Sequence, residues 1–376
     1  MVRAKHTKQK KNTRKISAVI ATMLVVVLAV LVFLYKDKFP TSSLSGSSGE
    51  VADIVSESEP FTYETGSQQM FTLMGDELAV SSSTGLQLLD SSGKTISREV
   101  FSMVNPAVCG NDSTCAVYDV GGYSLRIYKG GEFKNFDRTS EIISVSVNSG
   151  GYYAVAGYEA GYKGSVTVYD TALSPVYEWY SGSGYILDAA VSPDNTTLAV
   201  LCVESSGSIV HLFHFDSEKE FASVAVPNEL AFKLSFEKGG NFCVLSEKGM
   251  HFFGAKGQVL SDYGFDDNYL ANYTLSEEYW SVVLSKYVSG SNVTLLSFGN
   301  TGKALGAVPL STEPLSLSSQ GQQLLVLDSS NIALYSHDLR LQEQNHVSAG
   351  FVSAVLLSKG SVLLLSSHYG EKCSFR

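Results

Sequence analysis

The sequence predicts an all-β fold, a β-propeller of eight four-stranded blades, preceded by one N-terminal transmembrane helix. One pattern of short apolar strands recurs about every 40 residues, which is the period of a propeller blade. An uncharged run at residues 16–35 is long enough to cross a bilayer as a helix. Seven blades is the alternative, if one of the two less regular repeats at the start is not a blade.

The N-terminal tail, residues 1–15, carries seven Lys and Arg residues and no acid. A cleaved signal peptide is the alternative interpretation of the apolar run that follows. Such a peptide would have a shorter apolar region and a small-residue cleavage site, whereas this run ends in FLYKDKFP. We therefore expect an uncleaved, single-pass signal-anchor in the cell membrane. The charge bias predicts a cytoplasmic N-terminus and an extracytoplasmic C-terminal domain.

Residues 36–59 are rich in Ser, Gly and acids, which is typical of a flexible linker. We expect them to hold the domain at residues 60–376 away from the membrane. The whole chain has a formal net charge of −10, although its first fifteen residues contain only bases. The domain is therefore strongly acidic, and we expect no nucleic acid among its partners.

The repeat is clearest in the copy that begins at Asp188, DAAVSPDNTTLAVL, which indicates an apolar strand, a tight turn and a second apolar strand. A third, alternating strand follows each copy; in GSVTVYDT, Val166 and Val168 share one face. A fourth, more polar strand, such as PVYEWYSG from Pro175, completes the unit. Equivalent positions in the successive copies are Leu78, Ala116, Ala154, Leu198, Phe242, Trp280, Leu324 and Val362.

A ring explains why the unit is repeated. One such sheet cannot bury both of its apolar faces alone, but radially stacked sheets bury them against each other. The last copy, from Phe351, has material for three strands only. The segment PFTYETG from Pro60 is expected to supply the missing outer strand and close the ring.

The turn Ser192-Pro193-Asp194, followed by TTLAV, resembles the turn of WD-repeat-like and TolB-like bacterial propellers. Over residues 60–376, the ring is similar to these propellers and to the quinoprotein-type eight-bladed fold. The Trp-Asp and Gly-His dipeptides of true WD repeats are missing. With its anchor, the chain resembles membrane-anchored propeller proteins of Gram-positive bacteria whose function is not established.

Catalytic and metal-binding motifs are absent from the sequence. There is no G-x-S-x-G, P-loop, H-E-x-x-H or C-x-x-C pattern. His211 and His214 are three residues apart on a strand, so they point to opposite faces and cannot share a metal. The acidic segment DYGFDDN from Asp262 lacks the EF-hand spacing, and we interpret it as a solvated loop. We expect no metal, no cofactor and no catalytic residue that can be named.

The five cysteines cannot all be paired in disulfides within the chain, because their number is odd. Cys109 and Cys115 flank the turn GNDST, and a disulfide between them is feasible in an oxidising exterior; two unpaired thiols are the alternative. Cys202, Cys243 and Cys373 are expected to be buried thiols.

Aromatic residues suggest a binding surface in the third repeat. Tyr158 and Tyr162 lie in the loop GYEAGYKG, and Trp179 and Tyr180 lie on the strand that follows. Exposed aromatic side chains give a large contact area at low entropic cost, so these four are candidate ligand-binding residues. Packing between blades is the alternative.

The function that best fits these features is binding. We expect a membrane-anchored scaffold at the cell envelope whose unknown partner is a protein or a glycan. The alternative is an extracellular enzyme, a hydrolase or lyase acting on glycan or peptide, with its site in the central channel. The fold alone does not decide between the binding protein and the enzyme.

Overall fold

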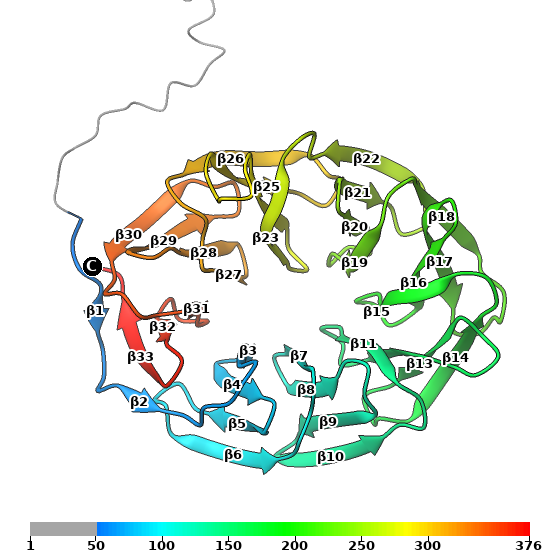
Figure 1. Ribbon diagram of the computed structural model, residues 1–376, viewed down its shortest axis with the longest axis horizontal. Coiled ribbons are helices and arrows are strands. Elements are labelled where there is room, and N and C mark those ends of the chain that lie inside the picture. The colour runs from blue at the N-terminus through cyan, green and yellow to red at the C-terminus, as the bar shows by residue number, and fades with distance from the viewer. Residues whose placement is uncertain (1–50) are drawn as a thin grey trace, which may run out of the picture. The chain divides into compact units, whose positions relative to one another are not determined.

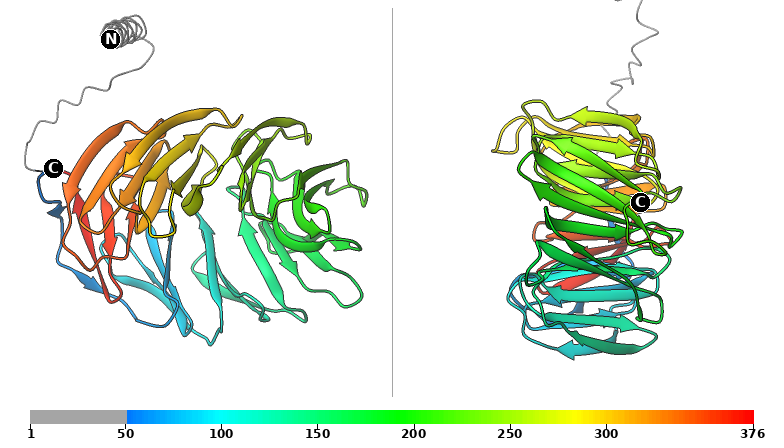
Figure 2. Two further views of the ribbon diagram at one scale, coloured as in Figure 1. Left: turned by 45° about the horizontal axis from the view of Figure 1, so that its top comes forward. Right: turned by 90° about the vertical axis from the view of Figure 1, so that its right-hand side faces the viewer.

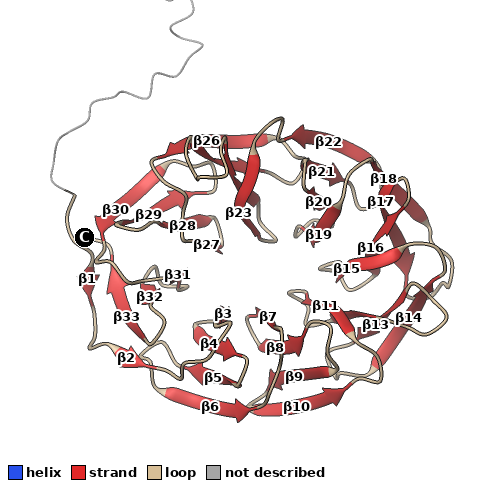
Figure 3. Cartoon of the chain, viewed as in Figure 1, coloured by secondary structure: helices blue, strands red, loops and turns tan. Residues whose placement is uncertain are grey.

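The computed structural model describes residues 51–376, which form a ring of eight radially arranged β-sheets (Figure 1). The described part of the chain consists of strands and loops (Figure 3). It contains no helix long and apolar enough to cross a membrane; the predicted span at 16–35 lies outside these residues. The prediction of eight rather than seven blades is confirmed.

Blades 1 to 4 follow one another in sequence, and each is a four-stranded antiparallel sheet. Blade 1 comprises β3 (Met70–Met74), β4 (Glu77–Ser82), β5 (Gly85–Leu89) and β6 (Thr95–Val100). Blade 2 comprises β7 (Pro106–Asn111), β8 (Thr114–Asp119), β9 (Ser124–Lys129) and β10 (Glu132–Asp137). Blade 3 comprises β11 (Ile142–Val147), β12 (Tyr153–Gly157), β13 (Gly164–Tyr169) and β14 (Pro175–Ser181). Blade 4 comprises β15 (Tyr185–Val191), β16 (Thr197–Glu204), β17 (Gly207–His214) and β18 (Ala222–Pro227).

Blades 5 to 8 continue the ring, and the last of them takes strands from both ends of the described chain. Blade 5 comprises β19 (Ala231–Phe236), β20 (Phe242–Ser246), β21 (Gly249–Phe253) and β22 (Val259–Gly264). Blade 6 comprises β23 (Tyr269–Leu275), β24 (Trp280–Ser285), β25 (Val293–Phe298) and β26 (Ala304–Leu310). Blade 7 comprises β27 (Ser316–Gln320), β28 (Gln323–Leu327), β29 (Asn331–Ser336) and β30 (Leu341–His346). Blade 8 comprises β31 (Ser353–Leu356), β32 (Val362–Leu365), β33 (Tyr369–Ser374), β1 (Val55–Ser56) and β2 (Phe61–Thr62).

The second strand of each blade lies deep between its neighbours and is buried on both faces. Every residue of β8, β16 up to Cys202, and β24 is buried, which explains their continuous apolar runs. Outer strands are mostly exposed, as in β30. The core therefore lies between blades; for example, the rings of Phe252 in blade 5 and Trp280 in blade 6 have centroids 5.5 Å apart.

The turn that suggested the resemblance is held by its own polar side chains. The Ser192 hydroxyl donates to Asp194 Oδ1 at 2.5 Å and accepts from the Thr197 backbone N–H at 2.9 Å. Asn195 has a φ of 60°, a conformation that asparagine tolerates better than most residues. Its side chain accepts from Asn148 of blade 3 at 2.7 Å. The turn thus also connects two blades.

The ring closes in blade 8, where segments from opposite ends of the described chain pair (Figure 1). Phe61 and Thr62 pair with β33, as the sequence predicts. Val55 and Ser56 also pair with β33, so the structure places these residues of the expected linker against the ring. The Tyr63 hydroxyl lies 2.7 Å from the Ser366 carbonyl oxygen and strengthens the closure.

Candidate functional site

The two faces of the ring are formed by different loops. Because the strands run from one face to the other (Figure 2), alternate connections of each antiparallel blade lie on the same face. We call "loop face" the side that gathers the loops between the second and third strands and the loops between blades. We call "hairpin face" the opposite side, which gathers the other two hairpin turns of each blade.

Most of the exposed large apolar side chains lie on the loop face. Five lie on the hairpin face, at Ile96, Val176, Phe221, Val259 and Leu341. On the loop face they are Val100, Val104, Val120, Tyr123, Tyr158, Tyr162, Tyr180, Tyr185, Leu230, Phe232, Tyr269, Tyr287, Val288, Leu315 and Val352. Single exposed apolar residues need no explanation, but their concentration on one face distinguishes that face from the other and makes it the candidate site.

Five tyrosines over blades 2 to 4 form the densest aromatic part of this face; we call Tyr123, Tyr158, Tyr162, Tyr180 and Tyr185 the tyrosine strip. The rings of Tyr162 and Tyr180 have centroids 4.9 Å apart. The Lys163 ammonium lies 4.6 Å from the centroid of the Tyr185 ring, within the range of a cation–π contact.

Glu141 joins the other two tyrosines of the strip. Its side chain accepts a long hydrogen bond from the Tyr123 hydroxyl at 3.4 Å. Its carbonyl oxygen accepts from the Tyr158 backbone N–H at 2.8 Å. The loops that carry the strip are thus connected to one another through hydrogen bonds.

Three of the four predicted aromatic residues lie on this surface, and Trp179 does not. Tyr158, Tyr162 and Tyr180 are all exposed. Trp179 precedes Tyr180 on β14, so it points to the other face of the strand. It packs against blade 4, with ring centroids 4.9 Å from Phe213 and 5.5 Å from His211. Trp179 is therefore a packing residue, as the alternative interpretation holds.

Cys109 and Cys115 are both free thiols, and the register of their hairpin explains why. Cys109 pairs with Ala116, and Cys115 pairs with Gly110. The two cysteines are thus one position out of register, and their side chains point to opposite faces of the sheet. Cys115 packs in the core toward blade 1, and Cys109 packs on the side of blade 3.

The central channel contains a charged pair that sequence reasoning missed. Lys233 Nζ of β19 lies 2.9 Å from Asp188 Oδ2 of β15. The same oxygen accepts from the Leu234 backbone N–H at 3.1 Å. The Asp188 side chain is 2% exposed, whereas that of Lys233 is 36% exposed, toward a cavity of about 560 Å³. The pair therefore joins blades 4 and 5 beside the channel.

Lys233 and Cys109 are two potential nucleophiles that line this cavity, and the surroundings of each keep it protonated. Burial lowers the pKa of Lys233, but the Asp188 carboxylate raises that pKa by more, so the net shift is upward. The ammonium therefore stays protonated. Burial raises the pKa of Cys109, which lines the same cavity, to about 12. At neutral pH this thiol is also protonated, although nucleophilic catalysis needs a thiolate or a neutral amine.

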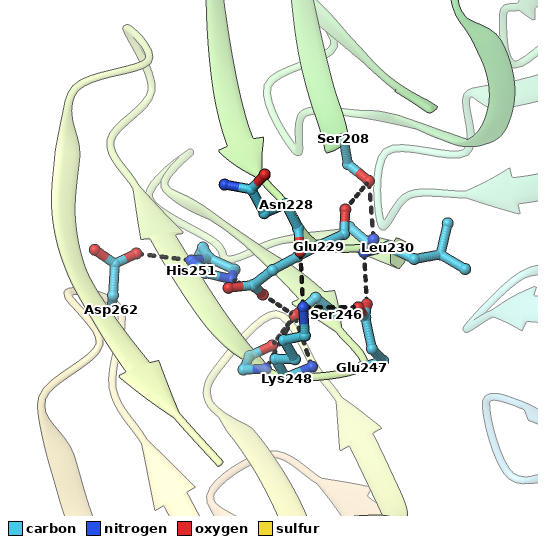
Figure 4. A network of polar contacts seen from close by, with 11 residues as sticks. Ser208, Asn228, Glu229, Leu230, Ser246, Glu247, Lys248, His251 and Asp262 are labelled. Atoms are coloured by element: carbon cyan, nitrogen blue, oxygen red, sulfur yellow. Dashed lines mark hydrogen bonds and ion pairs between the residues drawn. The ribbon is translucent and has the colours of Figure 1, made fainter. Parts of the chain in front are cut away.

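A polar network at the loop face connects blades 4 and 5 around His251 (Figure 4). His251 Nε2 lies 2.9 Å from Glu229 Oε2, and its Nδ1 lies 2.8 Å from Asp262 Oδ1. The Ser246 hydroxyl donates to Glu229 Oε2 at 2.5 Å. The network fixes the inter-blade loop that presents Leu230 on the loop face.

The carboxylate of Glu229 responds to these partners. Burial raises its pKa, but the hydrogen bonds from Ser246 and His251 lower that pKa more, so the net shift is downward. In the described part of the chain, no group of three or more His, Cys, Asp or Glu side chains is placed to hold a metal ion.

The model of the family described as "Family of unknown function (DUF5711)" matches residues 52–366. The chain belongs to this family. No curated protein matches this DUF5711 chain.

Solved structures similar to the DUF5711 chain are propellers of several kinds. The C-terminal WD40 domain of Sif2 has a TM-score of 0.60 at 10% identity, over 87% of this chain and 100% of that chain. BamB from Moraxella catarrhalis has a TM-score of 0.53 at 9% identity, over 86% and 100%. The dihydro-heme d1 dehydrogenase NirN has a TM-score of 0.54 at 14% identity, over 76% and 67%. These likenesses confirm the predicted resemblance in fold, and at such identities they show the fold alone.

Proposed function

We propose that this chain is a membrane-anchored scaffold that binds a protein partner on its loop face. The observation that carries the proposal is the concentration of exposed apolar side chains, above all the tyrosine strip, on one of the two faces of the ring. The propeller fold supports such a role in general, because its faces present many loops from a rigid core.

The tyrosine strip has the chemistry of a protein-binding surface. Tyrosine rings supply a large contact area with few rotatable bonds, and their hydroxyls still find polar partners at the edge of an interface. Tyr162 and Tyr180 are already in contact before any partner binds, so part of the ordering cost of association is met in the free protein. A protein partner fits this surface better than a nucleic acid, because the domain is acidic.

The anchor belongs to the same proposal. The basic residues ahead of 16–35 support a cytoplasmic tail, with the ring outside the cell membrane. In a full chain whose five native cysteines are replaced by serine, the substitutions Thr7→Cys and Ser43→Cys, made one at a time, test this with a membrane-impermeant maleimide on intact cells. We expect labelling at Ser43 only, and permeabilised cells serve as the control. Labelling at position 7 only would show that the topology is the reverse of the proposed one. Labelling at both positions would contradict the proposed membrane anchor.

Photo-crosslinking in living cells tests the binding face. A photoreactive phenylalanine analogue replaces Tyr162 or Tyr180 in the full chain, and Val176 or Leu341 on the hairpin face provides matched exposed controls. We expect one defined protein adduct from both loop-face positions and none of that mass from the controls. The proposal fails if the loop-face positions give no adduct, or if both faces give the same adducts.

A further inference from the structure

A pocket on the loop face lies between blades 5 and 6, separate from the tyrosine strip. It has a volume of about 500 Å³ and is lined by Phe232 of β19 and Tyr269 of β23, together with Glu247, Asp266 and Asp267. We call it the acidic aromatic pocket. Its lining residues include no Lys or Arg.

The two aromatic side chains make part of the pocket apolar and flat. Phe232 is 37% exposed and Tyr269 is 54% exposed. The Phe232 ring is supported by Tyr273, whose centroid lies 6.2 Å away. An exposed aromatic ring with a supported position can stack against a planar group without losing further side-chain freedom.

Of the three carboxylates in the pocket, Glu247 has partners within the protein and the two aspartates do not. Glu247 accepts from the Leu230 backbone N–H at 2.5 Å and lies 3.7 Å from the Lys248 ammonium. Within residues 51–376, Asp266 and Asp267 have no hydrogen-bond or ion-pair partner for their side chains. Two adjacent carboxylates are therefore open to a partner from outside.

The surrounding face has the same charge imbalance. Among its loops, Glu159 and Glu313 likewise have no side-chain partner in the described residues. The bases of these loops are mostly engaged: Arg138 donates to the Tyr169 hydroxyl at 2.8 Å, and Lys163 lies over Tyr185. A surface that is apolar, with unpaired carboxylates, complements a partner with basic and apolar side chains.

We propose that the acidic aromatic pocket takes an arginine side chain of the protein that docks on the loop face. A guanidinium can stack on an aromatic ring and at the same time donate two parallel hydrogen bonds to carboxylates. A lysine ammonium can make the ionic contact but not the planar stack, so it should bind more weakly. This inference rests on the proposed function, because it assigns part of the partner that the loop face would bind.

The test uses a small probe in place of the unidentified partner. Residues 51–376 form a compact unit that contains every strand of the ring, so this fragment is suitable. N-acetyl-arginine amide is titrated into the methyl-labelled fragment, and N-acetyl-citrulline amide is the control with the same shape and no charge. Leu270 lines the pocket and reports binding, while Leu341 on the hairpin face reports unspecific effects.

We expect saturable shifts of the Leu270 methyl signals with the arginine probe and none with the citrulline probe. The lysine analogue should bind several-fold more weakly. The double variant Asp266→Asn, Asp267→Asn should raise the Kd for the arginine probe at least about tenfold, because two charge-assisted contacts are removed. Phe232→Leu should also raise the Kd for the arginine probe, because the aromatic ring is lost while the charges stay intact. Unchanged Leu341 signals show that each variant is folded.

Equal binding of the citrulline probe, shifts that spread over the surface without saturation, or an unchanged Kd in the double variant would overturn the inference. These outcomes are separate from the cross-linking result. A defined loop-face adduct with no arginine binding would contradict the pocket inference and support the scaffold proposal. Arginine binding with no adduct from the loop face would contradict the scaffold proposal and support only a pocket that binds a basic group.

Discussion

The ion pair between Asp188 and Lys233 makes a quantitative prediction, because its two partners differ in burial. Lys233→Met leaves the Asp188 carboxylate, 2% exposed, with the Leu234 N–H as its one remaining donor. Removing one partner of a buried ion pair costs about 3–5 kcal/mol. Asp188→Asn leaves an ammonium that is 36% exposed to the channel, where water can solvate it. We expect this variant to lose no more than about 1 kcal/mol, because exposed charges depend less on their partner.

A double variant separates the effect of the charge from the effect of the side-chain shape. Asp188→Leu combined with Lys233→Met buries no charge, and its main cost is an unpaired Leu234 N–H, about 1–3 kcal/mol. It should therefore be more stable than Lys233→Met alone.

Guanidinium denaturation of the 51–376 fragment measures these differences in the free energy of unfolding. Unfolding is monitored by the fluorescence of the two tryptophans of the chain, Trp179 and Trp280. They lie in blades 3 and 6, so coincident transitions show that the ring unfolds as a unit. The reasoning is refuted if Lys233→Met is less destabilising than Asp188→Asn, or if the double variant is the least stable of the three.

Three further predictions follow from contacts in the ring. Trp179→Ala should lower the free energy of unfolding by about 2–3 kcal/mol, because half-buried packing against the next blade is lost. Tyr162→Ala should change the free energy of unfolding by no more than about 0.5 kcal/mol. Cys109, with its pKa raised to about 12, should react with iodoacetamide at pH 8 much more slowly in the native protein than after denaturation; equal rates would contradict the raised pKa. The lowered pKa of Glu229 contributes stability that is present above its unfolded value of about 4.3 and is lost as the pH falls through its folded value. Glu229→Gln should therefore be less stable than wild type at pH 7, with a gap that narrows below about pH 4; a constant gap would show that the charge is not involved.

The number of blades followed from the sequence because each blade must bury its second strand on both sides. The apolar core of that strand, such as the segment around Leu198 or Trp280, recurs at a period that only a ring explains. The segment from Pro60 was predicted to close the ring because the last copy of the repeat has material for three strands only, and Phe61–Thr62 within it pair with β33. The strand at Val55–Ser56 was not predicted, because two residues flanked by acidic residues carry no strand pattern. They form a strand because they pair with the edge of β33.

Side-chain direction was harder to predict than strand position. Adjacent residues on a strand point to opposite faces, so Trp179 and Tyr180 could not both be on the surface, but the sequence does not say which one is inward. The register of the hairpin at Cys109 depends on a two-residue turn, and a shift of one position separates the thiols.

Contacts between blades had one usable signal in the sequence. Asp188 and Lys233 begin successive copies of the repeat, and opposite charges at equivalent positions of two neighbouring apolar strands indicate a pair. The acidic aromatic pocket had no such signal, because Phe232, Glu247 and Tyr269 come from different strands and loops.

The entry of the chain into the ring has a geometric consequence. The segment from Val51 joins the rim at blade 8, and the tyrosine strip lies over blades 2 to 4, toward the other side of the ring (Figure 1). A disc tethered at its rim can swing about that point, and the part opposite the tether sweeps the widest arc. Under the proposed anchoring through the N-terminal side, the tyrosines would therefore search the largest volume for the proposed partner while the attachment point stays fixed.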